Sequence, residues 1–149
     1  MKKQNLSDSN FELWHLVGKV NHSLMKARQK ELNQYRIPAR QAYILRTMQD
    51  LGKNTTLSEL AKKVEREVHV ISRQTVKMEN DGLIKRIKDT PKSNLLRLEL
   101  TEKGLEIIKV SKRSKSIDTI FSYFSREERQ QFESALNLIL TKLDENHLV

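Results

Sequence analysis

Residues 56–88 read TLSELAKKVEREVHVISRQTVKMENDGLIKRIK, and this segment carries the clearest structural signals in the chain. Thr56 and Glu59 have the spacing of a capping box, in which the side chain of each accepts a hydrogen bond from the backbone N–H of the other. This pattern predicts a short helix from Leu57 to about Val64. Residues 65–67 then interrupt the helical pattern. The segment therefore begins with a short helix and a tight turn.

A second helix is predicted from about Val68 to Asn80, with Gly82 following as a terminator. Its inward positions are Ile71, Thr75 and Met78. The outward positions carry side chains that can contact bases or phosphates: His69, Ser72, Arg73, Val76 and Lys77. Taken alone, these charges also fit an ordinary solvated helix face. The basic hairpin that follows and the concentration of positive charge in this segment favour a recognition helix for the DNA major groove.

The pattern then changes from helical spacing to alternation, which is typical of strands. Residues 83–88 and residues 95–100 predict two strands, and Asp89 to Asn94 form a polar turn between them. Leu96, Leu98 and Leu100 share one face of the second strand. Two helices joined by a short turn and followed by a basic hairpin predict a winged helix-turn-helix.

The distribution of charge supports a nucleic-acid partner. The 149 residues include 28 Lys or Arg and 19 Asp or Glu, which gives a net charge of +9. Residues 60–97 alone contain ten Lys or Arg and five Asp or Glu, so more than half of the excess lies in about a quarter of the chain. A structural surface does not require that concentration, whereas neutralisation of phosphates does.

Further helices are predicted on both sides of this module. An apolar stripe predicts a helix from about Phe11 to Gln34, which Ser9 or Asn10 can cap. A second helix is expected from about Ala39 to Leu51 and ends at Gly52.

On the C-terminal side, Thr101 is expected to cap one long helix from about Glu102 to Phe124. A second capping box, formed by Ser125 and Glu128, opens a last helix that extends to about Asn146. The apolar stripes of the first and last helices include Phe11 and Trp14 near the N-terminus and Phe132, Leu136, Ile139 and Leu143 near the C-terminus.

These two stripes can pack on each other within one subunit, or they can form the interface of a dimer. A pair of helices of this size makes a thin core on its own. A twofold dimer would complete that core and place two recognition helices on one face of a duplex. We therefore expect a homodimer whose interface includes the six apolar residues named above.

Several other classes of protein are disfavoured. Cys is absent, which excludes disulfides, thiolate metal sites and thiol-based oxidant sensing. No apolar run approaches the roughly 18 residues of a membrane span, and residues 1–10 do not resemble a signal peptide, so the expected location is the cytoplasm. No nucleophile–base pair, phosphate-binding glycine loop or metal-ligand cluster is evident, so no enzyme, cofactor or metal is predicted.

The chain resembles the MarR (multiple antibiotic resistance regulator) family of winged-helix transcription factors over about residues 11–143. Residues 57–64 (LSELAKKV) resemble the first helix of the family's helix-turn-helix, and Ser72-Arg73 lie where its recognition helix carries serine and arginine. Residues 78–86 (MENDGLIKR) resemble the run that leads into the wing. Residues 98–104 (LELTEKG) resemble the leucine-threonine-glycine signature at the start of the following helix.

Three positions depart from the family pattern. Residues 92–94 read Lys-Ser-Asn where the family often has Asp-Arg-Arg in the wing, so the usual minor-groove arginine is missing. Residues 65–67 read Glu-Arg-Glu in place of Gly-Leu-Ser, and these carboxylates oppose phosphate unless Arg66 pairs with one of them. Gln74 replaces a leucine of the recognition helix. The resemblance therefore implies an operator that differs from a standard one.

The expected fold is mostly α, with a small β-hairpin wing. Residues 36–101 are expected to form the winged-helix DNA-binding lobe, and residues 10–34 and 102–147 are expected to form a helical dimerisation lobe. The resemblance implies a homodimeric, sequence-specific regulator, usually a repressor, that binds a palindromic double-stranded operator. It also implies a small anionic or phenolic effector bound between the lobes. The alternative function is a non-specific architectural nucleic-acid-binding protein.

The candidate residues form two sets. Those expected to contact DNA are Thr56, Ser58, His69, Val70, Ser72, Arg73, Gln74, Lys77, Lys88, Lys92 and Arg97. Those expected near an effector are Trp14, His15, His22, Tyr43 and Arg46.

Overall fold

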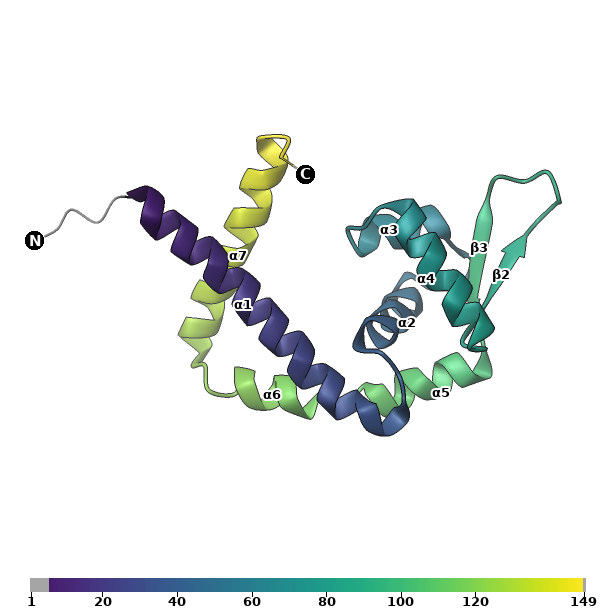
Figure 1. Cartoon of the computed structure of the whole chain (residues 1–149), viewed down its shortest axis with the longest axis horizontal. Helices are drawn as coiled ribbons and strands as arrows, with labels where there is room; N and C mark the ends of the chain where they lie inside the picture. The colour runs from purple at the N-terminus through teal and green to yellow at the C-terminus, as the bar shows by residue number, and fades with distance from the viewer. Residues whose placement is uncertain (1–5, 149) are drawn as a thin grey trace, which may run out of the picture. The chain divides into compact units, whose positions relative to one another are not determined.

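A computed structural model describes residues 6–148, which fall into two compact units that divide between residues 114 and 115. The first unit holds most of the elements: α1 (Leu6–Leu32), η1 (Asn33–Tyr35), α2 (Ala39–Leu51), β1 (Thr55–Thr56), α3 (Leu57–Lys63), α4 (Val68–Asn80), β2 (Ile84–Lys88), β3 (Leu96–Leu100) and α5 (Glu102–Ser111). The second unit holds α6 (Lys115–Phe121) and α7 (Arg126–Glu145). Figure 1 shows these elements along the chain.

The ends of α2 and α4 and the start of α3 lie where local signals in the sequence predict them. The predicted bounds of α2 and α4 are confirmed. Gly52 and Gly82 follow these helices with φ of +91° and +74°, values that glycine adopts without steric cost. Thr56 and Glu59 form the predicted capping box at the start of α3.

The predicted hairpin is confirmed and belongs to a sheet of three strands. The strand order is β1-β3-β2, and both pairs are antiparallel. Ile84 lies opposite Leu100 at the base of the hairpin, and Lys88 lies opposite Leu96 toward its tip. Strand β1 was not predicted, because a strand of two residues is too short to show alternation.

The core of the first unit fills the space between its helices and the sheet. Its fully buried apolar side chains include Leu32, Ile44, Leu45, Met48, Leu60, Ile71, Met78, Ile84 and Leu98. Helix α5 packs on this core through Gly104, where an added Cβ would lie 2.2 Å from the carbonyl oxygen of Leu83. Thr101 caps α5 by accepting the Gly104 N–H, and its hydroxyl donates to the Gly82 carbonyl. The turn into β2 is thereby fixed to the start of α5.

Two predictions about helix bounds are wrong. Helix α1 begins at Leu6, so Ser9 and Asn10 lie inside it and do not cap it. The long helix predicted from residue 102 to residue 124 is interrupted at residues 112–114 and becomes α5 and α6.

The reason for the interruption is a contact from a distant segment. The Arg28 guanidinium, on α1, donates to the carbonyl oxygens of Ser111 and Arg113. These bonds satisfy carbonyls that a continuing helix would have used itself. No Gly or Pro lies near the break, so the residues around it contain no signal for it.

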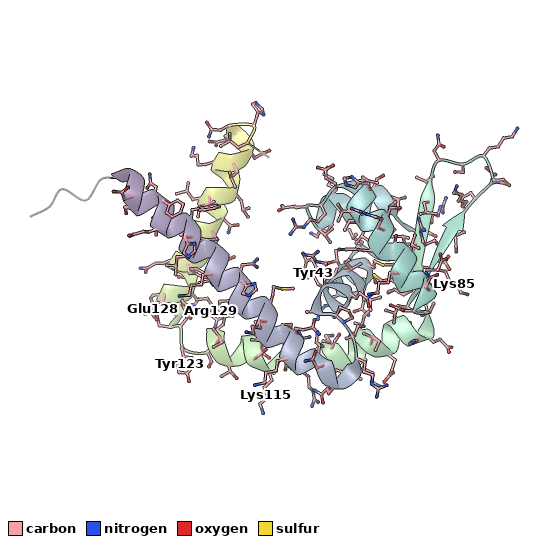
Figure 2. The ribbon with its side chains drawn as sticks, in the orientation of Figure 1. Tyr43, Lys85, Lys115, Tyr123, Glu128 and Arg129 are labelled. Carbon is pink, nitrogen blue, oxygen red and sulfur yellow. The ribbon has the colours of Figure 1, made fainter. Side chains whose placement is uncertain are left out.

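In the second unit, α6 and α7 are joined by a short turn. Ser125 and Glu128 form the predicted capping box of α7. The Arg129 guanidinium donates to the Phe121 carbonyl at 2.6 Å, and both Glu128 and Arg129 lie at the turn in Figure 2. The Phe124 and Phe132 rings pack with centroids 5.7 Å apart, which ties the turn to α7.

Candidate nucleic-acid interface

Helix α4 has the two faces expected of a recognition helix. Ile71, Thr75 and Met78 are buried, as predicted. Among the residues predicted to contact DNA, His69, Arg73 and Lys77 are exposed, and Val70, Ser72 and Gln74 are half-buried. The exposed set supplies two permanent cations and one imidazole on the outward face. This face can neutralise phosphates and donate to base edges.

The N-terminus of α3 is the second predicted contact region. The Thr56 hydroxyl donates to the Glu59 carboxylate at 3.0 Å and accepts a hydrogen bond from the Glu59 N–H at 3.2 Å. The hydroxyl of Thr56 is therefore engaged in the helix cap. The hydrogen bonds from the Thr56 N–H and hydroxyl lower the pKa of Glu59 below its usual value. Ser58 is exposed in the first turn of the helix. Of the two predicted hydroxyls, Ser58 is the more available to DNA.

The wing extends beyond α4 (Figure 1) and carries cations in two different states. Lys88 and Lys92 are exposed. Arg97 instead forms an ion pair with Asp89 at 2.9 Å across the base of the wing tip. This pair was not predicted from the sequence, because it depends on the register of the two strands. It lowers the charge that Arg97 can offer to a phosphate.

The turn between α3 and α4 contains the unusual acidic residues. Glu65 has a φ of +51°, a left-handed conformation that glycine adopts more readily. Glu67 stands at the N-cap of α4, without a side-chain hydrogen bond to the helix. Within residues 6–148, no ion pair joins Arg66 to either carboxylate. Both carboxylates are exposed beside the recognition helix.

Two contacts join the wing to α4. The Arg86 backbone N–H, on β2, donates to the Glu79 carboxylate at 2.9 Å. The Arg86 guanidinium donates through Nη2 to the Ser72 hydroxyl oxygen at 3.3 Å. Arg86 was not among the predicted site residues, because nothing in the local pattern reveals a contact between residues 14 positions apart.

A cavity of about 370 Å³ lies between α1, α2 and α4. Of the predicted effector residues, Tyr43 lines it, and Figure 2 shows Tyr43 on the side of α2 that faces α1. Trp14, His15 and His22 are exposed on α1, and Arg46 pairs with Asp50 at 3.8 Å. The four do not line this cavity. Apart from Tyr43, its polar lining comes from residues that were not predicted to bind an effector: Asn21, Arg40, Arg66 and Gln74.

One atom of that lining is unsatisfied. The Gln74 side-chain oxygen is buried and accepts no hydrogen bond from any residue between 6 and 148. Buried acceptors nearly always accept a hydrogen bond, and the described residues supply no donor to this oxygen. A second cavity, of about 480 Å³, lies between the end of α2, β3 and α5 and contains none of the predicted site residues.

The residues predicted to form a dimer interface lie on both units. Phe11 and Trp14 are exposed on α1. On α7, Phe132, Leu136 and Ile139 are exposed and Leu143 is half-buried. Each unit thus leaves bulky apolar side chains uncovered by the chain itself.

Metal-binding clusters and membrane-spanning helices are absent from the described part of the chain. Across residues 6–148, no group of three or more His, Cys, Asp or Glu side chains is placed to hold a metal ion. The helices of the same residues are too short or too polar to cross a membrane.

The chain is similar in sequence and in fold to known regulators of transcription. No protein-family model matches the chain. Among curated proteins, the uncharacterised HTH-type transcriptional regulator YsmB of Bacillus subtilis is 27% identical over 136 residues, which cover 89% of each chain.

Solved structures of similar fold include several regulators. An organohalide-sensing transcriptional regulator, crystallised with 2,4-dichlorophenol, has a TM-score of 0.83 and 25% identity over 95% of this chain and 83% of its own. A MarR family protein from Bacillus stearothermophilus has a TM-score of 0.68 and 26% identity, covering 93% and 97%. A mutant MarR from E. coli in complex with operator DNA has a TM-score of 0.81 and 18% identity, covering 92% and 99%.

Proposed function

We propose that this chain is a DNA-binding transcriptional regulator of the MarR family, and that it is a homodimeric repressor that binds a palindromic operator in the cytoplasm and is released by a small effector. One observation carries the DNA-reading part of this proposal. Helix α4 buries Ile71, Thr75 and Met78 and turns Arg73 and Lys77 outward, next to a basic wing. This arrangement lets a helix enter the major groove while the wing contacts the flanking backbone.

The DNA-reading role is tested by selecting binding sites from a pool of random duplexes. We expect one recurring inverted repeat, whose half-sites are about one helical turn apart. Arg73→Ala is expected to weaken binding to that site by roughly 1–3 kcal/mol and to relax its base preference. Lys109→Ala, which removes an exposed cation from α5, serves as the control. Equal binding to all duplexes, with a steep salt dependence, would instead support the architectural alternative.

The effector part of the proposal is supported by the cavity between α1, α2 and α4. Arg40 and Arg66 supply positive charge to its lining, Tyr43 supplies a phenol, and Gln74 supplies the unsatisfied oxygen. A small aromatic ligand with a hydroxyl or carboxylate group matches this lining. Because Gln74 lies on the recognition helix, a ligand bound to it would act directly on the position of α4.

This part is tested with 2,4-dichlorophenol and benzoate as probes. We expect at least one of them to bind and to release the protein from its selected operator. Arg40→Ala removes a cation of the cavity lining that is not among the predicted DNA contacts, so it should weaken that release while it leaves binding to DNA in the absence of the probe largely intact. Arg46→Ala, outside the cavity lining, is the control. Failure of both probes to bind, or to change operator occupancy, would reject this cavity as an aromatic effector site.

A further inference from the structure

The Arg86 guanidinium reaches from the wing to the recognition helix. Its Nη2 donates to the Ser72 hydroxyl oxygen at 3.3 Å, and its backbone N–H donates to the Glu79 carboxylate at 2.9 Å. Arg86 and Ser72 are both half-buried. Ser72 lies between the buried Ile71 and the exposed Arg73, at the edge of the outward face of α4. Arg86 is therefore placed to act on the recognition helix through one side chain.

Arg86 is poorly placed to act as a stabilising ion pair. Its Nε is buried without a hydrogen-bond partner, and no carboxylate of residues 6–148 forms an ion pair with its guanidinium. A half-buried cation without a carboxylate loses hydration that no counter-charge restores. Its positive charge instead lies next to the Ser72 hydroxyl, where it polarises that group.

The direction of the hydrogen bond follows from the chemistry of the two groups. A guanidinium has only donors, so the Ser72 oxygen must be the acceptor. The hydroxyl hydrogen of Ser72 is then left for another partner, and the adjacent positive charge makes the hydroxyl a better donor and a poorer acceptor. The direction of this bond therefore determines what Ser72 can recognise.

We propose that Arg86 is a positioning residue for DNA recognition, which holds Ser72 as a hydrogen-bond donor to an acceptor atom on a base edge. The inference rests on the proposed function, in which α4 lies in the major groove. Guanine O6 and N7 and thymine O4 are acceptors in that groove, whereas cytosine offers only its amino group. Adenine also presents an acceptor, N7, so the base that Ser72 contacts should be guanine, thymine or adenine in preference to cytosine.

The test uses the full-length protein and the operator that the wild type selects from random duplexes. Ser72→Ala, Arg86→Met and the double variant form a mutant cycle, in which affinity, base preference and salt dependence are measured. Lys85→Met is the matched control, because it removes a cation from the same strand. Lys85 is exposed and lies at the base of the hairpin in Figure 2. Thermal melting establishes that each variant is folded.

If the inference is right, Ser72→Ala and Arg86→Met each weaken operator binding about three- to tenfold, the range for one lost hydrogen bond. The double variant should be no weaker than the weaker single variant, because both changes remove the same interaction with the base. Both single variants should admit cytosine at the same position of the site. Lys85→Met should leave the base preference unchanged.

Other results would overturn the inference. Multiplicative losses in the double variant would mean that Arg86 and Ser72 act separately. An unchanged base preference in Arg86→Met, with the slope of log affinity against log salt reduced by about 0.9, would make Arg86 a direct phosphate ligand. A wild type that selects no sequence at all would refute the proposed function itself, and this inference with it.

A further variant covers the case in which Arg86→Met does not fold. Arg86→Lys keeps the charge but lacks the planar fork of donors. We expect it to relax the base preference in part, without a change in salt dependence. Full retention of the preference in Arg86→Lys, together with a normal loss in Ser72→Ala, would contradict the positioning role.

Discussion

Gly104 controls how closely α5 approaches the chain that enters β2. An added Cβ would lie 2.2 Å from the Leu83 carbonyl oxygen, and backbone cannot move aside as a flexible side chain can. Although Ala favours helix more than Gly does, Gly104→Ala must displace α5 from the core. We expect a loss of about 1–3 kcal/mol in the free energy of unfolding, measured in urea. Glu106→Ala, on the exposed side of α5, should change it by less than about 0.5 kcal/mol.

Glu65 stores strain at the turn of the helix-turn-helix. Its φ of +51° places a residue with a Cβ in the left-handed region, at a cost of roughly 1–2 kcal/mol. Glu65→Gly should therefore raise the free energy of unfolding by up to about 1 kcal/mol, because glycine adopts this conformation freely but also gains entropy in the unfolded chain. Glu65→Ala removes the same carboxylate and keeps the strain. Equal stability of the two variants would show that the carboxylate, and not the backbone, is responsible.

At the scale of elements, the ion pair between Asp89 and Arg97 partly neutralises the positive charge of the wing. Asp89→Asn should free the guanidinium and remove a negative charge near the DNA backbone. We expect tighter binding to any duplex, and a slope of log affinity against log salt that steepens by up to about 0.9, because Arg97 can then neutralise one more phosphate. Glu99→Gln removes an exposed carboxylate from β3 without freeing Arg97, so it serves as the control. An identical salt slope in wild type and Asp89→Asn would indicate that Arg97 does not reach DNA.

The elements also differ in how far their bounds could be predicted. The bounds of α2 and α4 were correct, because glycines and helical spacing within each segment determine them. The break between α5 and α6 was missed, because its cause is Arg28, more than 80 positions away. The same limit applies to the site. The outward residues of α4 follow from periodicity, whereas the contact of Arg86 with Ser72 and the lining of the cavity depend on tertiary packing.

At the scale of the whole molecule, each of the two units leaves apolar side chains exposed on a long helix. Trp14 on α1 is 70% exposed and Ile139 on α7 is 49% exposed, and neighbouring apolar residues on both helices are similar. Large contiguous apolar surfaces on a chain commonly mark an interface with another protein. The proposed palindromic operator would require two recognition helices related by a twofold axis, so a second copy of this chain is the partner that we propose for these side chains.

Single charges placed on these helices test the dimer. The wild type should sediment with the mass of two chains at micromolar concentration. The variants Trp14→Asp and Ile139→Asp should each shift the mass toward one chain, because burying an unpaired carboxylate in an apolar interface costs too much free energy. Each variant should also bind the operator at least about a hundredfold more weakly, since the second half-site no longer adds to the first. Leu51→Asp changes an exposed apolar residue at the end of α2 and should remain dimeric. A wild type that sediments as a single chain while it binds a palindrome would instead mean that DNA itself assembles the pair.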